Sequence, residues 1–136
     1  MQGGDFLKGK EKSISRSELV VMNVLWREGR CPASRVVDQV AKHSDWHFRT
    51  VKTLLRNLVA KGFVGYEVDA QDSRIYYYTP LVDEEQYLQQ ERQQFLHLYY
   101  GGDRSSLLAG FLQDGKLSAA EAEKLRRMLN SSAEEE

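Results

Sequence analysis

The chain has 136 residues, 41% of them hydrophobic and 29% charged, which is the composition of a folded globular protein and excludes general disorder. Its net charge of −1 by itself indicates no anionic partner, but residues 1–82 hold 13 basic and 9 acidic side chains, whereas residues 83–136 hold 6 and 11. This asymmetry favours a part that faces nucleic acid joined to a part with another role.

A single cysteine, Cys31, excludes an internal disulfide framework and a zinc site built on several thiolates. No apolar run approaches the roughly 20 residues that a membrane-spanning helix needs. The N-terminal residues contain no hydrophobic signal core. These features together predict a cytoplasmic protein that does not associate with a membrane.

In chain order, residues 1–12 are expected to form a flexible basic arm, and the first helix is expected to begin at the capping box Ser15-x-x-Glu18 and to end at Gly29. Pro32 suits the start of a second helix, and a third is predicted from about Phe48 to Lys61, followed by a glycine at a C-terminal cap position.

From Phe63 the pattern changes. Residues 63–68 and 74–79 are rich in aromatic and β-branched side chains, and the polar segment 69–73 between them predicts the turn of a β-hairpin. Three helices followed by a hairpin predict a winged helix-turn-helix DNA-binding domain over residues 13–82.

Residues 83–131 are expected to form a helical dimerisation domain of three helices, and residues 132–136 an acidic tail. The fold class is therefore mainly α with a small β-hairpin. Because three short helices bury little surface alone, their apolar side chains are expected to pack against a second copy of the chain. The residues expected in that interface are Tyr87, Phe95, Leu96, Tyr99, Leu107, Leu108, Phe111, Leu125 and Leu129.

The third helix has two different faces. Helical spacing places Phe48, Val51, Leu54, Leu55, Leu58 and Val59 on the inward side. The remaining positions carry guanidinium, hydroxyl and carboxamide groups that suit base edges and phosphates, and they predict DNA contacts at Arg49, Thr50, Lys52, Thr53, Arg56 and Asn57. The alternative is a solvated cationic face with no ligand.

Arg74 lies beside the hairpin turn, where a wing would meet the phosphate backbone, and is predicted to bind DNA as well. Asp69 and Asp72 in the same turn favour the alternative, an ordinary soluble hairpin. Lysines of the N-terminal arm are expected either to add non-specific phosphate contacts or to serve only as a solubilising tail.

Several separate segments resemble the penicillinase repressor family of BlaI, MecI and CopY. They are residues 46–63 (WHFRTVKTLLRNLVAKGF), 14–26 (ISRSELVVMNVLW), 95–102 (FLHLYYGG), 107–111 (LLAGF) and 117–121 (LSAAE). The similarity extends over about residues 13–130, and it is strongest to the BlaI and MecI branch. The copper-responsive branch carries a cysteine-rich C-terminal metal site, and this C-terminal part contains no cysteine.

The resemblance implies a homodimeric repressor that occupies a palindromic operator of double-stranded DNA, one that controls a β-lactamase or another antibiotic-resistance gene. It also implies release of the operator when a sensor metalloprotease cuts the chain, and the pair that matches the family's Asn-Phe site is Gln94-Phe95. The family often begins the recognition helix with Ser-Pro, whereas this chain has His47-Phe48, a weaker cap.

Other functions have less support. His43 and His47 lie on either side of a helix break, so no metal is expected, and neither is a cofactor. Cys31 has no resolving partner in the chain, and no nucleophile elbow or HExxH motif indicates an enzyme. The remaining alternatives are a winged-helix regulator of a non-antibiotic operon and a winged-helix module that binds protein.

Overall fold

The computed structural model describes residues 13–134, so the predicted basic arm at residues 1–12 lies outside the described residues. The described residues form helices and a small sheet in the predicted order. The elements are α2 (Arg16–Glu28), β1 (Cys31–Pro32), α3 (Ala33–Ala41), α4 (Phe48–Ala60), β2 (Val64–Val68), β3 (Tyr76–Pro80), α5 (Glu84–Tyr100), α6 (Arg104–Asp114) and α7 (Ala119–Glu134).

The ends of α2 are fixed by the two features predicted for them. The Glu18 amide donates to the Ser15 hydroxyl oxygen, and the Ser15 amide donates to the Glu18 carboxylate, which completes a capping box. At the other end Gly29 has φ 75° and ψ −151°, a conformation essentially restricted to glycine. Both predictions for this helix are confirmed.

The hairpin is also confirmed, and the sheet holds one strand more than the sequence predicts. β2 pairs with β3, and the short β1 adds to the other edge of β3, so that the order is β1-β3-β2 with both pairs antiparallel. Cys31 lies in β1 opposite Tyr78. Two residues are too short a strand to show any periodicity in sequence.

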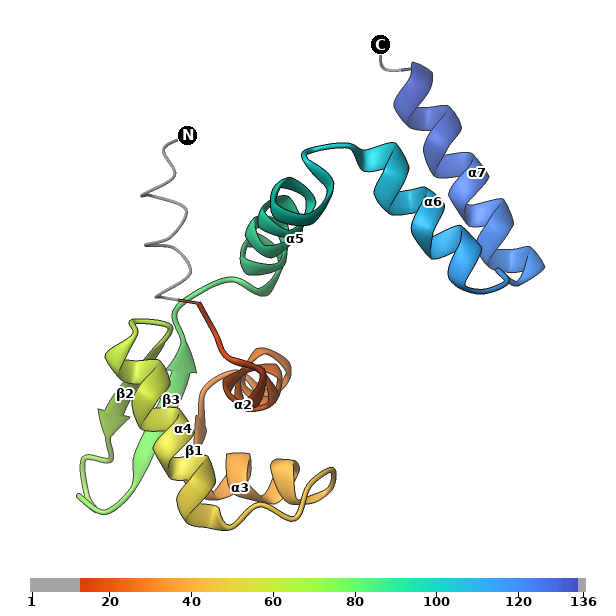
Figure 1. Cartoon of the computed structure of the whole chain (residues 1–136). Helices are drawn as coiled ribbons and strands as arrows, with labels where there is room; N and C mark the ends of the chain where they lie inside the picture. Colours follow the sequence, from red (N-terminus) through yellow and green to blue (C-terminus); the bar gives the residue numbers. More distant parts are fainter. Residues whose placement is uncertain (1–12, 135–136) are drawn as a thin grey trace. The chain divides into compact units, whose positions relative to one another are not determined.

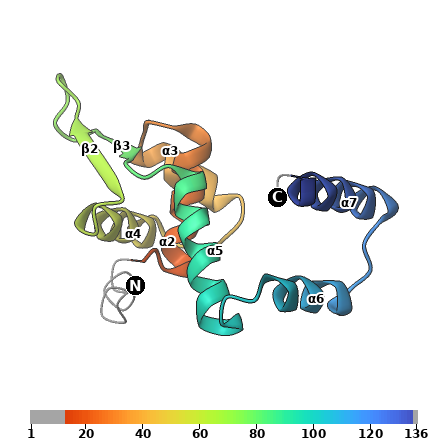
Figure 2. The ribbon, with the colours of Figure 1, turned by 90° about the horizontal axis from the view of Figure 1, so that it is seen from above.

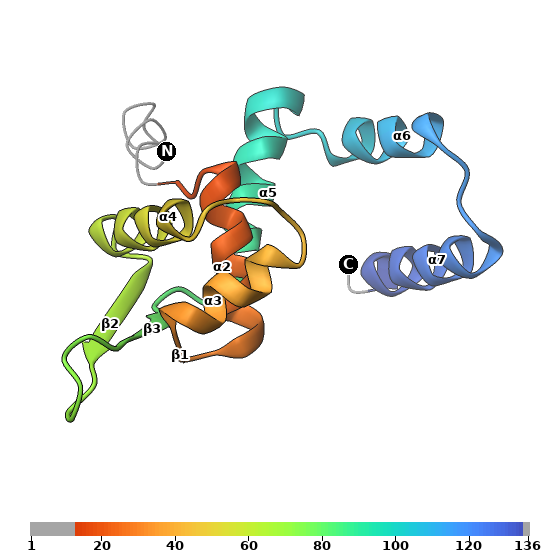
Figure 3. The same ribbon diagram turned by 90° about the horizontal axis from the view of Figure 1, so that it is seen from below.

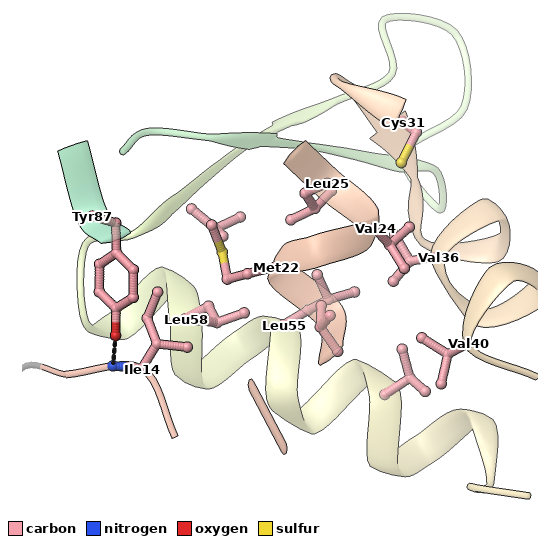
Figure 4. Packing of buried hydrophobic residues seen from close by; sticks show 13 residues of the cluster. Ile14, Met22, Val24, Leu25, Cys31, Val36, Val40, Leu55, Leu58 and Tyr87 are labelled. Carbon is pink, nitrogen blue, oxygen red and sulfur yellow. Dashed lines mark hydrogen bonds between the residues drawn. The ribbon is translucent and has the colours of Figure 1, made fainter. Parts of the chain in front are cut away.

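The core of the winged-helix part lies between α2, α3 and α4, and β1 and β3 contact it from one side (Figure 1). Met22, Leu25, Leu55 and Leu58 are fully buried there and point toward one another (Figure 4). The turn of the hairpin projects away from these helices (Figures 2 and 3). This packing leaves the opposite side of α4 and the hairpin free.

The first turn of α5 belongs to this same core. Tyr87 is buried, and its hydroxyl oxygen accepts a hydrogen bond from the Ile14 amide over 3.1 Å (Figure 4). Its ring packs against Trp26 and Phe63. The described chain divides into two compact units after Gln90, inside α5, whereas the sequence predicts a boundary between residues 82 and 83. The sequence pattern shows where α5 begins, but it does not show that the first turn of this helix packs against the preceding unit. The boundary therefore falls inside the helix.

In the second unit, α6 begins at Asp103, whose carboxylate accepts from the Ser105 and Ser106 amides. α7 begins at a capping box formed by Ser118 and Glu121. This helix continues to Glu134 and so includes the start of the expected acidic tail at residues 132–136, of which residues 135–136 lie outside the described part. No described helix is long and apolar enough to cross a membrane.

Candidate nucleic-acid interface

α4 is held in place at both of its ends. The Nδ1 atom of His47 accepts a hydrogen bond from the Arg49 amide over 3.1 Å, so the His47 side chain serves as the N-cap that Ser would supply. At the other end Gly62 has φ 85°, and the Phe63 amide donates to the Leu58 carbonyl over 3.0 Å. The predicted left-handed glycine cap is therefore present.

The outward side of α4 carries every side chain that the sequence predicts to contact DNA in this helix. All of them are exposed, namely Arg49, Thr50, Lys52, Thr53, Arg56 and Asn57. On the inward side Val51, Leu55 and Leu58 are buried. The helix contains neither Asp nor Glu, and within the described residues no carboxylate forms an ion pair with its three cations. The exposed face is therefore electropositive and open to an anion.

One residue of α4 departs from the prediction. Phe48 is expected on the buried side, but 44% of it is exposed. Its ring lies 4.4 Å from the His47 ring, and the Lys52 ammonium and the Arg49 guanidinium lie 5.3 and 5.9 Å from its centre. Periodicity indicates on which side of a helix a residue lies. It does not indicate how far along the helix axis the neighbouring elements extend. Phe48, in the first turn of α4, lies largely outside the packed part.

The Arg74 side chain extends from the hairpin but is already paired. Its Nε and Nη2 atoms donate to the two carboxylate oxygens of Asp72, each over 3.0 Å, and the Arg74 hydrogen bonds hold the pKa of Asp72 below its usual value. Asp69 accepts from the amides of Gln71 and Asp72 and so shapes the turn. Binding a phosphate would require Arg74 to exchange one anionic partner for another.

The hairpin also brings residues to α4 that the sequence interpretation did not single out. Between α4 and the hairpin lies a hollow of about 410 Å³. Its lining comprises Ala33, Lys52, Arg56, Val59, Tyr66, Arg74, Tyr76 and Tyr78, and we call it the tyrosine groove. Strand alternation places Tyr76 and Tyr78 on one face, but only the register of β2 against β3 adds Tyr66 to that face.

The two rival sites considered from sequence gain no support. Cys31 is buried, and burial together with the nearby Glu28 raises the pKa of its thiol, which disfavours a reactive thiolate. In the part of the chain that the structure describes, no three His, Cys, Asp or Glu side chains gather closely enough to hold a metal ion.

The residues predicted to form the dimer interface differ in how far they are buried within one chain. Tyr87 packs inside the first unit and Leu96 is buried within the single chain, so neither offers a free side chain. Leu107 is half-buried, and the other six remain exposed, namely Phe95, Tyr99, Leu108, Phe111, Leu125 and Leu129. α6 has no buried residue at all, although it carries four large apolar side chains. Apolar exposure on this scale is typical of a surface that another molecule covers.

The candidate cleavage pair lies inside α5. Gln94 is half-buried, Phe95 is 45% exposed, and the Phe95 ring packs on Tyr99 of the next helical turn with 4.9 Å between ring centres. A protease must bind its substrate in an extended form, so cutting at this bond requires local unwinding of α5.

Three helices followed by a hairpin, with an acid-free exposed face on the third helix, define a winged-helix DNA-binding protein. The family model "Penicillinase repressor" matches residues 14–131, and the chain therefore belongs to the penicillinase repressor family.

Individual relatives agree with this assignment. The chain is 32% identical over 120 residues to the penicillinase repressor of Bacillus licheniformis, covering 88% of this chain and 91% of that protein. It is 31% identical over 124 residues to the methicillin resistance regulatory protein MecI of Staphylococcus aureus strain N315, covering 91% and 98%. A crystal structure of a mutant MarR from E. coli shares the fold, with a TM-score of 0.54 at 16% identity over 95% of this chain and 83% of that one.

Proposed function

We propose that this protein is a homodimeric transcriptional repressor that occupies a palindromic operator of an antibiotic-resistance operon, such as one encoding a β-lactamase. The observation that carries the proposal is the outward face of α4, on which two guanidinium groups, an ammonium, two hydroxyls and a carboxamide stand exposed without a carboxylate. The two relatives at 32% and 31% identity are a penicillinase repressor and a methicillin resistance regulatory protein. Bidentate Arg contacts to guanine and Asn contacts to adenine would supply the discrimination between bases.

Substitutions in α4 test this part of the proposal. Arg56→Ala and Thr53→Ala should each weaken binding to the duplex that the wild-type protein selects from a random DNA pool, while the dimer remains intact by sedimentation. Arg104→Ala, an exposed arginine of α6, serves as the matched control and should bind as wild type does. Unchanged mobility shifts for both α4 variants would show that α4 does not contact the operator.

Salt dependence separates DNA binding from the alternative of a protein-binding module. Each neutralised phosphate releases counterions, so the affinity for DNA should fall steeply as salt rises. A winged-helix module that binds protein would show no such binding to duplex DNA. Salt dependence does not identify which operon the protein regulates. A gene for a β-lactamase or a membrane metalloprotease next to the gene of this protein would favour an antibiotic-resistance operon over a non-antibiotic one.

Dimerisation is the second part of the proposal, and the exposed apolar side chains of α5, α6 and α7 support it. In a dimer, binding of one winged helix to its half-site holds the second one close to the other half-site. The resulting high effective concentration raises the affinity for the full operator without any new contact. Phe111→Ser and Leu129→Ser should therefore shift the protein toward monomer and weaken binding to the full operator, but not to a half-site. Leu81→Ser, also exposed but in the first unit, is the matched control.

Release by proteolysis is the third part, with Gln94-Phe95 as the candidate bond and a sensor metalloprotease as the candidate partner. A chain that ends at Gln94 lacks α6 and α7 but keeps α4 and the Tyr87 contacts. It should bind a half-site like the full chain and lose the affinity gained from pairing. N-terminal sequencing of the fragment formed in cells exposed to a β-lactam identifies the bond, and a cut elsewhere or no cut contradicts this assignment.

A further inference from the structure

The tyrosine groove lies on the flank of α4 that faces the hairpin. Lys52 and Arg56, one helical turn apart, form its α4 side, and Val59 continues that side toward the end of the helix. The hairpin forms the other side with Tyr66 from β2, Tyr76 and Tyr78 from β3, and Arg74 from the turn. The groove therefore combines three cations with three aromatic rings.

The three rings form one contiguous group. Tyr66 lies opposite Tyr78 in the sheet, and the Tyr76 ring stacks on Tyr66 with 5.3 Å between ring centres and an interplanar angle of 25°. The Tyr78 ring lies 6.3 Å from Tyr66 and 6.4 Å from Tyr76. Such packing holds the rings in place without requiring their hydroxyls.

Those hydroxyls are available to a ligand. Within the described residues, none of the three hydroxyls takes part in a hydrogen bond, in contrast to the buried hydroxyl of Tyr87. Burial, reinforced by Tyr76 and opposed by the guanidinium of Arg56, raises the pKa of Tyr78. Its phenol therefore keeps its proton and can donate to an anion at neutral pH.

We propose that the tyrosine groove holds the sugar–phosphate backbone of the operator strand that runs beside α4, with hydroxyls of Tyr66, Tyr76 and Tyr78 donating to phosphate oxygens. Lys52 and Arg56 neutralise the phosphate charge, and the aromatic rings pack against deoxyribose. This inference rests on the proposed function, because it needs α4 to lie in the major groove.

The position of the groove favours backbone over bases. Lys52 and Arg56 form the edge of the outward face of α4 that borders the groove, whereas helical spacing places Arg49, Thr53 and Asn57 further round that face, toward the bases. A strand bordering the major groove would therefore pass between helix and hairpin. Tyrosine hydroxyls, Lys and Arg are among the groups that commonly bind DNA phosphates, and such contacts fix the register of the protein on the duplex. The groove would thus determine how far α4 enters the major groove.

Substitutions that remove only the hydroxyl test the proposal. Tyr66→Phe, Tyr76→Phe and Tyr78→Phe should each weaken binding to the selected duplex roughly 2- to 10-fold, the loss expected for one hydrogen bond, and the triple variant should lose more. Tyr77→Phe is the matched control, because Tyr77 lies on the opposite face of β3, with Arg30 4.3 Å above its ring. Thermal unfolding should be unchanged in all five variants.

Neutral phosphates in the duplex identify the partner of the hydroxyls. Each phosphate of the duplex is replaced in turn by a neutral methylphosphonate. At some positions the wild-type protein should lose affinity for the duplex. At one or more of these positions the triple variant should lose clearly less affinity than the wild type does. The proposal is overturned if the triple variant binds as wild type does, or if both proteins show the same methylphosphonate profile.

Failure of the proposed function gives a different result. In that case the wild-type protein selects no duplex and shows no salt-dependent affinity for DNA, and the groove proposal falls with it. If instead Arg56→Ala and Thr53→Ala weaken binding while the three tyrosine variants do not, α4 contacts DNA and only the groove proposal fails.

Discussion

Lys61 and Glu18, 43 residues apart in the chain, form an ion pair in which the Lys61 ammonium donates to Glu18 Oε1 over 2.7 Å. The Glu18 side chain is only 4% exposed, and its same oxygen completes the capping box with the Ser15 amide. Lys61 also donates to the Ser13 carbonyl over 3.1 Å. The pair thus joins the start of α2 to the end of α4, the proposed recognition helix.

Removing the cation should destabilise the fold. Lys61→Met leaves the Glu18 carboxylate buried without its cation. We expect the free energy of unfolding to fall by about 3 kcal/mol, which is the lower end of the range for breaking a buried ion pair, because Lys61 is partly exposed. Urea unfolding at fixed protein concentration measures the loss. Lys42→Met, at the exposed end of α3, should cost little, and equal losses in both variants would contradict a specific role for the pair.

The same pair should make stability depend on acidity. Burial raises the pKa of Glu18, but the hydrogen bonds from Lys61 and Ser15 outweigh it and leave that pKa below its ordinary value of 4.5. A carboxyl with a lowered pKa in the folded state stabilises the fold above its unfolded pKa and loses that contribution as the pH falls through the folded value. The stability difference between wild type and Glu18→Gln should therefore shrink as the pH drops below about 4.5. Parallel pH profiles would rule out this linkage.

The N-cap of α4 should contribute measurably although it is a histidine. His47→Ala removes the acceptor of the Arg49 amide and should lower stability by about 1 kcal/mol, whereas His47→Ser keeps an acceptor and should cost less. His43→Ala serves as the control, because His43 is exposed in the loop before α4 and caps no helix. Thermal unfolding of the three variants should rank His47→Ala lowest.

The docking of α5 onto the winged helix should depend on one hydroxyl. Tyr87→Phe keeps the ring packing but deprives the buried Ile14 amide of its acceptor, and we expect a loss of about 1–2 kcal/mol. Tyr99→Phe removes a hydroxyl from a residue that is 68% exposed and should change stability little. If both variants unfold at the same denaturant concentration as wild type, the Tyr87 hydroxyl contributes nothing to this contact.

Much of the fold could be predicted because its determinants are local. Capping boxes at Ser15 and Ser118, glycines at 29 and 62 and the change of period after Phe63 each depend on residues a few positions apart. The outward face of α4 follows from helical spacing in the same way. The segments that resemble the penicillinase repressor family are likewise continuous in the sequence, and the match of the family model over residues 14–131 confirms that resemblance.

Other features of the site could not be predicted, because they depend on where distant segments meet. The exposure of Phe48 depends on how far the neighbouring elements extend along α4, and the position of Tyr87 depends on a contact with Ile14, 73 residues away. No local pattern encodes either one.

The sequence by itself thus determined the order of the elements, the polar face of α4 and the family, since periodicity and caps act within one or two helical turns. Only the tertiary structure decided that β2 and β3 align Tyr66 with Tyr78 beside Lys52 and Arg56, and that Lys61 neutralises Glu18. The physical reason is that strand register and long-range pairing are set by the packing of the whole core, which fixes separations between residues that the chain leaves far apart.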